Sequence, residues 1–399
     1  MKLRRLTIYE SLIWMIVFLL ILQINFYTLL LAESLTLIVF FIYLTQEDRK
    51  IINTKWIYLY IVFEFLLLLF QVMRVNNGPS ISIKLSFLYY SDVLLLLLTF
   101  PIYEILKTDF QNFFKKLNLL GICALILRTI IWFLYNFLHY DIGFYQWGGG
   151  RQDWARALGP FLLFRSNGLF IDGFLFAYAL SRIFNKNSKE KNKLVFYAEI
   201  LFLFFFSYVV YQSRTQVIYY VVTLLIGIIY INFHKGEQLL NLIITAVVIL
   251  LIGYIFRDSI IGFINSFSQN TDTGGSTSVR ILEYQYFPRL WKENSFWFGF
   301  GYIDTENILC AGYRLYLTDL GILAQLYQNG LVGFVICILP VVMGLVVTIK
   351  SFMQKYNYYN SVIIFFSIYI IVSSSNFNPY VYIYFPIMPL FTAMIMSKE

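Results

Sequence analysis

The residues of this sequence that could do chemistry are mainly arginines, many of them beside long apolar runs or in two longer polar segments. A guanidinium group stays charged and presents a fork of N–H donors that matches phosphate oxygens. The pattern therefore favours an anionic, phosphate-bearing ligand, with ion pairs to nearby carboxylates and contacts to lipid head groups as the alternative. The arginines are Arg74, Arg151, Arg156, Arg165, Arg214, Arg257, Arg280, Arg289 and Arg314, and the carboxylates are Asp141, Asp153, Asp258, Glu283 and Glu306.

Three of these arginines occupy positions that favour a direct role in binding a ligand. Arg214 follows one apolar run and begins the next, so its head group is held at a fixed depth; snorkelling to the membrane surface is its alternative role. Arg280 begins an amphipathic segment, where a lipid head-group contact is the alternative. Arg165 lies at the start of another apolar run and could hold a phosphate or simply cap that run.

The composition of the chain excludes most soluble classes. Of 399 residues, 59% are hydrophobic and 13% are charged, whereas about 25% of the residues of a soluble protein are charged. The 41 Phe, 32 Tyr and 7 Trp exceed what one soluble core buries, and the mean hydropathy is +0.70. We therefore expect a polytopic membrane protein, not a cytosolic enzyme, a secreted disulfide scaffold or a disordered chain. Cys123, Cys310 and Cys337 are too widely spaced for a metal site or a disulfide framework.

The predicted fold is an all-α bundle of about 12 transmembrane helices in a single polytopic domain covering 1–399, because a spanning helix needs about 20 mostly apolar residues. Lysines collect in the N-terminal residues and in loops at 46–55, 107–116, 185–193, 234–238 and 350–359, so these segments and both termini are predicted to be cytoplasmic. The arginine-rich segments then face outward. The predicted spans are 6–26, 28–45, 56–74, 87–106, 117–138, 168–184, 194–211, 215–233, 239–256, 331–349, 360–376 and 379–396.

Two outer loops are long enough to build a site. The first, 139–167, contains a triple glycine followed by Arg151, Arg156 and Arg165. The second, 257–330, lies between the ninth and tenth spans. Within it, residues 269–278 (QNTDTGGSTS) have the composition of a flexible connector. Residues 279–293 predict an amphipathic helix at the membrane surface, bent near Pro288.

Three short motifs follow one another between residues 165 and 349. Residues 165–170 read RSNGLF, with Asp172 and Gly173 shortly after, and residues 213–215 read SRT. The long outer loop carries Arg280, the pair Gly299 and Gly301, and Thr318-Asp319 before Gly330 and Gly333. In order and topology these motifs resemble the bacterial O-antigen polymerase and O-antigen ligase family of membrane glycan transferases. That family often has Pro-Asn at the position of Asp172 and Gly173, and His-Asn near Asp319.

The resemblance implies a donor glycan on undecaprenyl pyrophosphate in the outer leaflet, which the enzyme transfers to an acceptor while lipid pyrophosphate leaves. An aspartate in place of the histidine favours a polymerase, with a lipid-linked repeat unit as acceptor, over a ligase. A flippase or transporter of lipid-linked oligosaccharide is the alternative from another class, for which inverted repeats and charged mid-membrane helices are expected. Membrane lipids and a chain-length regulator protein are the other expected partners; nucleic acid is not.

In such a transferase the catalytic residues are expected to be Asp319, Arg214 and Arg280. Asp319 is the candidate general base for the acceptor hydroxyl, and its alternative role is to cap the helix that follows. His139 is the alternative base. The arginines would stabilise the leaving pyrophosphate. The expected substrate-binding residues are Arg165, Arg151, Arg156, Arg289, Arg314 and Asp172.

No cofactor is expected. The sequence has no acidic or histidine cluster with metal-ligand spacing and no nucleotide-phosphate loop, so metal-free transfer from a lipid-linked donor is predicted. Arg128 lies within the fifth span, where a charge is costly. We expect it to form a buried pair with Asp92 or Glu104.

Overall fold

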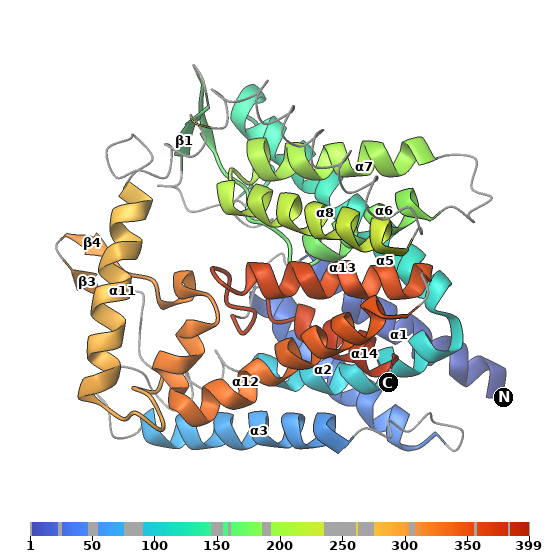
Figure 1. The fold of residues 1–399 in the computed structure, drawn as a ribbon, viewed down its shortest axis with the longest axis horizontal. Helices are drawn as coiled ribbons and strands as arrows, with labels where there is room; N and C mark the ends of the chain where they lie inside the picture. The colour runs from blue at the N-terminus through green and yellow to red at the C-terminus, as the bar shows by residue number, and fades with distance from the viewer. Residues whose placement is uncertain are drawn as a thin grey trace.

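In the computed structural model, the described residues form mainly helices, together with two small antiparallel hairpins (Figure 1). It describes residues 2–22, 26–46, 55–75, 91–144, 155–158, 161–185, 193–234, 261, 275–302, 308–310, 312–354, 357–381 and 384–398. The helices are α1 (Lys2–Leu22), α2 (Phe26–Leu44), α3 (Lys55–Val75), η1 (Ser91–Leu98), α5 (Thr99–Leu138), α6 (Asp172–Phe184), α7 (Lys193–Phe205), η2 (Phe206–Val210), α8 (Arg214–His234), α11 (Gly275–Glu293), η4 (Leu317–Leu320), α12 (Leu323–Phe352), α13 (Tyr358–Ser373) and α14 (Ile387–Met396). The hairpins pair β1 (Ala155–Leu158) with β2 (Phe161–Phe164), and β3 (Leu309–Cys310) with β4 (Tyr313–Arg314).

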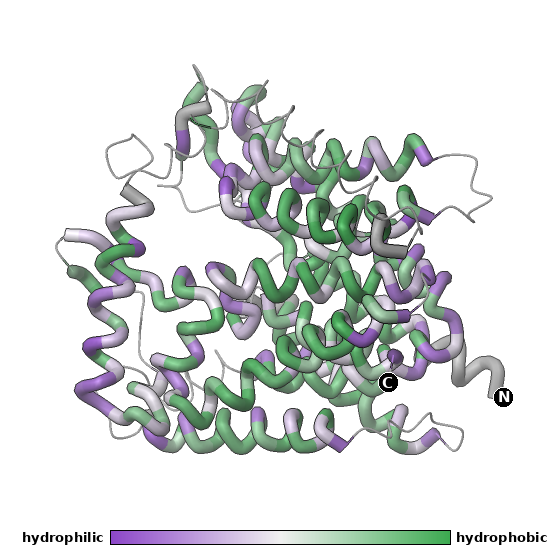
Figure 2. The backbone as a smooth tube through the Cα atoms, viewed as in Figure 1, coloured by the Kyte–Doolittle hydropathy of each residue, from purple (hydrophilic) through white to green (hydrophobic). Residues whose placement is uncertain are grey.

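Several helices have the length and apolarity of membrane spans, which indicates a multi-pass membrane protein. Within the described ranges, five helical segments meet both requirements: Lys55–Arg74, Ser91–Leu138, Lys193–Val210, Arg214–Ile231 and Leu323–Phe352. Helix α3 shows how such a segment is built. Leu59, Val62, Leu66 and Leu69 form an exposed stripe on one face, whereas Tyr60 and Glu64 are buried on the other. Exposure of such an apolar stripe to lipid carries no free-energy cost, whereas its exposure to water would be unfavourable. Figure 2 shows the apolar residues concentrated in these helices, with α11 more mixed.

The predicted spans and the observed helices differ at two places, and one predicted span cannot be compared. The loop expected at 107–116 is helical apart from Asp109, whose φ of −151° and ψ of 81° interrupt α5. The Asp109 carboxylate accepts a hydrogen bond from Asn112 N (3.0 Å) and so restarts the helix as an N-cap does. Among the described residues of the span predicted at 379–396, only those of α14 are helical, and Pro386, which lacks an N–H, stands directly before its first residue. The span predicted at 239–256 lies outside the described residues.

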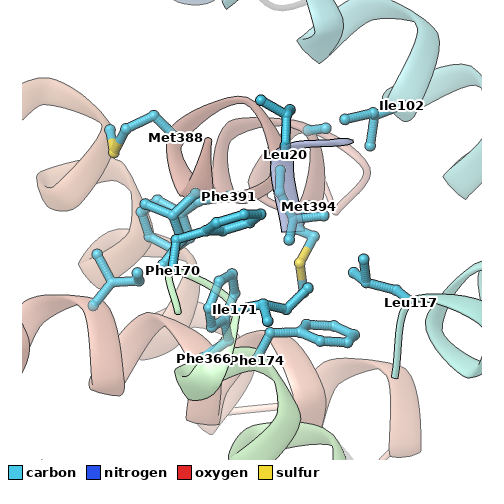
Figure 3. Packing of buried hydrophobic residues seen from close by; sticks show 14 of the residues in the cluster. Leu20, Ile102, Leu117, Phe170, Ile171, Phe174, Phe366, Met388, Phe391 and Met394 are labelled. Atoms are coloured by element: carbon cyan, nitrogen blue, oxygen red, sulfur yellow. The ribbon is translucent and has the colours of Figure 1, made fainter. Parts of the chain in front are cut away.

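Helix α6 lies at the centre of the bundle and is buried on almost every side, as expected for a helix that is apolar all round. A Cβ on Gly173 would lie 2.0 Å from ring carbons of Tyr369, so only glycine lets α13 approach this closely. Figure 3 shows Phe170, Ile171 and Phe174 packed with Phe366 of α13 and Phe391 of α14. This core fixes the chain that enters α6 just after Arg165.

Helix α12 is broken at Gly330, and the segment that follows α11 fills the break. Gly330 has φ +68° and ψ −171°. Backbone N–H groups of Leu331 and Val332 donate to the carbonyls of residues 296 and 297 (both 3.1 Å), while Phe300 N donates to Tyr327 O (3.1 Å). A Cβ on Gly330 would meet the Trp297 backbone at 2.3 Å. The glycines singled out in the sequence therefore allow two backbones to touch, and they tie the end of α11 to α12.

Helix α11 runs across the ends of α3 and α12 rather than along them (Figure 1). The helix predicted at 279–293 is confirmed, and it begins four residues earlier than expected, so the last part of the predicted connector is helical. Its position at the membrane surface stays a prediction. Phe287 is fully buried and packs in a second apolar cluster with Leu315, Leu317, Leu320, Ala324 and Tyr327. This cluster fastens α11 to η4 and to the first turn of α12, and so brings Arg280 near Asp319.

Candidate functional site

Four arginines from separate parts of the chain share one region of the structure. Arg156 comes from β1, Arg165 from the residue after β2, Arg214 from the start of α8 and Arg280 from α11. Burial and the positive charges of the other three lower the pKa of Arg156 to about 10. Like charges in one region repel one another, so the arrangement is suited to an anion that would neutralise them. We call these residues the arginine group.

Asp319 lies beside the arginine group. Burial raises the pKa of its carboxyl, and the charges of Arg280 and Arg165 hold that pKa down. Asp319 belongs to the short helix η4, whereas α12 begins at Leu323 with no side-chain cap. The alternative role considered for Asp319, as the N-cap of the helix that follows, is therefore wrong. Two of the four arginines therefore act directly on the Asp319 carboxyl.

Polar side chains of α5 fix the segment that carries Arg165. Trp132 Nε1 donates to Phe164 O (2.7 Å), and Asn136 bonds both the N–H (2.7 Å) and the carbonyl (3.2 Å) of Phe164. One turn before Trp132, Arg128 Nη1 donates to Asn167 O (3.2 Å). Residues four apart share one helix face, so these three side chains form a polar ladder along which the extended chain around Arg165 is bonded.

The expected pairing of Arg128 with Asp92 or Glu104 is wrong. Its second guanidinium nitrogen donates to Leu22 O (3.0 Å), and the carboxylate that acts on it electrostatically is Asp172. Backbone carbonyls and one carboxylate therefore satisfy this buried cation. The sequence could not predict these partners of Arg128, because any residue has a backbone carbonyl that can accept a hydrogen bond.

A short polar segment between η2 and α8 holds Arg156 and Arg214. The Gln212 carbonyl accepts a hydrogen bond from Arg156 Nη1 (2.9 Å), and Gln212 itself has a positive φ of 53°. Arg214 is the first residue of α8, where Ser213 Oγ accepts from Gln216 N (3.3 Å). A helix N-terminus also presents free N–H groups and a positive dipole end, which add to the attraction for an anion.

Arg165 packs against the Tyr211 ring, with 5.5 Å between Cζ and the ring centroid. Behind that ring lies a cavity of about 30 Å³ whose lining includes Gly168, Asp172, Tyr211 and Tyr384. Asp172 is only 1% exposed there, and its Oδ2 accepts a hydrogen bond from Leu169 N (3.3 Å). This predicted substrate-binding residue therefore lines the cavity together with Tyr211, and the arginine that acts on its charge is Arg128, which is not a member of the arginine group.

Glu283 is the residue near the arginine group that the sequence did not single out as functional. It follows Arg280 by three residues, is fully buried, and its Oε1 accepts a hydrogen bond from Tyr316 N (2.7 Å). Burial, and next the charge of Asp319, raise its pKa to about 8, while the Tyr316 N–H and Arg280 oppose the shift. Its spacing from Arg280 on one amphipathic helix was the signal that could have identified it.

Two further predicted substrate-binding arginines, Arg289 and Arg314, are not among the charges that act on Arg156. Arg289 on α11 and Arg314 on β4 are both exposed, and Arg151 lies outside the described residues. Arg74 has a structural role instead, since its guanidinium donates to Phe298 O (2.6 Å) and Gly299 O (3.0 Å). His139, the alternative base, is the exposed residue that ends α5 in a left-handed conformation.

Within the part of the chain that the structure describes, no group of three or more His, Cys, Asp and Glu side chains could hold a metal ion. A scan against protein-family models and a search of curated proteins returned no match. The functional argument therefore depends on the geometry of the site and on the motifs of the sequence.

Proposed function

We propose that this chain is a membrane polymerase of the O-antigen or capsular type. It would transfer a growing glycan from undecaprenyl pyrophosphate to a new lipid-linked repeat unit at the outer face of the cytoplasmic membrane. The observation that carries the proposal is the convergence of Arg165, Arg214 and Arg280 on Arg156, with Asp319 beside Arg280 and Arg165. Segments far apart in sequence supply these charges, and a leaving pyrophosphate is the kind of anion they would stabilise.

In the proposed reaction, the acceptor hydroxyl oxygen attacks the anomeric carbon of the donor glycan. The bond from that carbon to the pyrophosphate oxygen breaks, and its electron pair leaves with the pyrophosphate. The hydroxyl proton goes to Asp319, the only carboxylate of the described residues whose charge is attracted by both Arg280 and Arg165. Attack from the face opposite the leaving group inverts the anomeric configuration, so a retained linkage in the product would contradict this mechanism.

The full topology is part of the proposal. Twelve spans with both termini in the cytoplasm would place 139–167, 212–214 and 257–330 outside, and these segments contain every member of the arginine group. Five apolar helices of sufficient length, and the position of α11 across the ends of α3 and α12, support this arrangement. Cysteine-accessibility labelling should find residue 275 outside and residue 189 inside; the reverse would remove the outward-facing site.

One observation favours the alternative of a transporter for lipid-linked oligosaccharide. Glu33, Glu64 and Asp92 are all buried within apolar helices of the bundle, each 3% exposed. Charged groups at membrane depth are costly and often mark a transport pathway. In the proposed polymerase these three carboxyls have no assigned role.

The test is reconstitution of the purified protein with an undecaprenyl-pyrophosphate repeat unit, without nucleotide sugar and with chelator. We expect a ladder of glycan lengths that is lost in Arg214→Ala and Arg280→Ala and weakens sharply in Asp319→Asn. Transfer only to a lipid A core, without a ladder, would identify a ligase. Movement of the lipid-linked unit to the other leaflet without any new linkage would identify a transporter.

A further inference from the structure

Glu283 lies underneath the arginine group. It is 0% exposed, and its Oε1 holds the Tyr316 N–H at 2.7 Å, three residues before Asp319. Its other oxygen, Oε2, is buried and has no hydrogen-bond partner among the described residues, and the same is true of Arg280 Nε, one turn earlier on α11. Burying Oε2 without a hydrogen bond costs much free energy if the Glu283 carboxyl is ionised and far less if the carboxyl is neutral.

Few charges reach Glu283 from the elements packed around it. From its own helix the acting charge is Arg280, and from η4 it is Asp319. The first turn of α12 contributes Ala324 and Tyr327 to the apolar cluster below. Two neighbouring carboxyls compete for one guanidinium, and the charge of Asp319 opposes ionisation of Glu283.

We infer that anion binding at the arginine group is coupled to a proton on Glu283: the site binds a diphosphate while Glu283 is neutral, and ionised Glu283 draws Arg280 to itself and weakens binding. The inference rests on the anion site of the proposed polymerase and adds its regulation by pH. Glu283 is a positioning residue in this scheme, since it acts through Arg280 and through the backbone before Asp319.

The direction of the coupling follows from the charges. The pKa of Glu283 is about 8, raised first by burial and then by Asp319, so the carboxyl is neutral below that pH and ionised above it. A bound anion brings further negative charge and raises that pKa again. Binding between about pH 8 and pH 9 should therefore take up a proton from solvent, and affinity should fall as pH rises.

The experiment is calorimetric titration of the full-length protein in nanodiscs with geranyl pyrophosphate, from about pH 7 to pH 9.5 and in two buffers of different ionisation enthalpy. For the wild type we expect the affinity to fall by up to about tenfold per pH unit above pH 8, with proton uptake on binding. Glu283→Gln keeps the neutral shape and should bind with little change over this range and with less proton uptake. The comparison with wild type removes any titration of the ligand itself.

Asp319→Asn provides a second variant if Glu283→Gln does not fold. Because the charge of Asp319 raises the pKa of Glu283, its removal should move the alkaline loss of affinity to lower pH. Equal pH dependence in wild type, Glu283→Gln and Asp319→Asn would overturn the coupling while leaving the anion site intact. Absence of binding at every pH, in folded wild-type protein, would instead contradict the anion site of the proposed function.

Discussion

Two regions of this molecule use arginine in opposite ways. At the end of α3, Arg74 places its donors on the carbonyls of Phe298 and Gly299, and inside the bundle Arg128 does the same with those of Leu22 and Asn167. In the arginine group, Arg156 also donates to a carbonyl, that of Gln212, but its guanidinium is in addition repelled by the charges of Arg165, Arg214 and Arg280. Arg74 and Arg128 fix the chain, whereas for the arginine group we propose that a bound anion relieves the repulsion.

The largest expected difference between the two regions is in activity. Arg280→Ala should reduce polymer formation by at least about 100-fold, because a charge opposite the leaving pyrophosphate is lost, while thermal stability stays close to that of the wild type. Arg74→Ala should instead lower the free energy of unfolding by about 2 kcal/mol through its lost hydrogen bonds. Activity assays and thermal unfolding in detergent measure both. An inactive, fully stable Arg74→Ala would contradict this division.

The next largest effect concerns the backbone contact that Arg74 supports. Gly330→Ala should lower the free energy of unfolding by several kcal/mol. The added Cβ would lie 2.3 Å from the Trp297 backbone, and the backbone φ at this position is +68°. Gly312→Ala is the matched control, since its φ is +82° but no atom lies within 4 Å of the added Cβ, and it should cost only about 1 kcal/mol. Thermal unfolding should separate the two variants. Equal losses would mean that 296–301 does not fill the break in α12.

A smaller effect is expected from the polar ladder of α5. Asn136→Ala removes both hydrogen bonds to Phe164, so Arg165 should lose its fixed position and activity should fall by about tenfold. Asn118→Ala on the same helix loses a bond to Glu199 instead and should keep its activity at a similar cost in stability. Initial rates of polymerisation would compare them. The ladder has no positioning role if both variants retain full activity.

The smallest effect tests the repulsion itself. Arg156→Gln removes one of four like charges, so the apo protein should become more stable by less than about 1 kcal/mol at low salt. The gain should disappear at high salt or when a diphosphate ligand is present. Thermal unfolding at several ionic strengths would show this. A loss of stability at low salt would mean that the bond from Arg156 to Gln212 O outweighs the repulsion.

Sequence pattern predicted the parts of the site that depend on depth and periodicity. The positions of Arg165, Arg214 and Arg280 beside apolar runs, and the amphipathic helix now seen as α11, needed only local information. The helical conformation of 107–116 was not predicted, because a charge-rich stretch between apolar runs is typical of a loop. The structure shows that Asp109 caps a new helical segment there, so the chain continues as a helix. The spacing of Glu283 from Arg280 could have identified it, whereas the ladder on α5 depends on backbone partners from a distant segment, which residue types do not encode.

The most direct test of the central claim is whether the arginine group exists as one anion site. The test uses a protein whose cysteines are replaced by serine and that carries Arg214→Cys together with Arg280→Cys. A short bis-maleimide should join the two new cysteines. Geranyl pyrophosphate, bound by the remaining Arg156 and Arg165, should slow this cross-linking. Arg214→Cys combined with Arg289→Cys should not be joined, since Arg289 is exposed and lies half a helical turn from the face of Arg280. Failure of the first pair to cross-link, or cross-linking at the same rate with and without the diphosphate, would contradict the account.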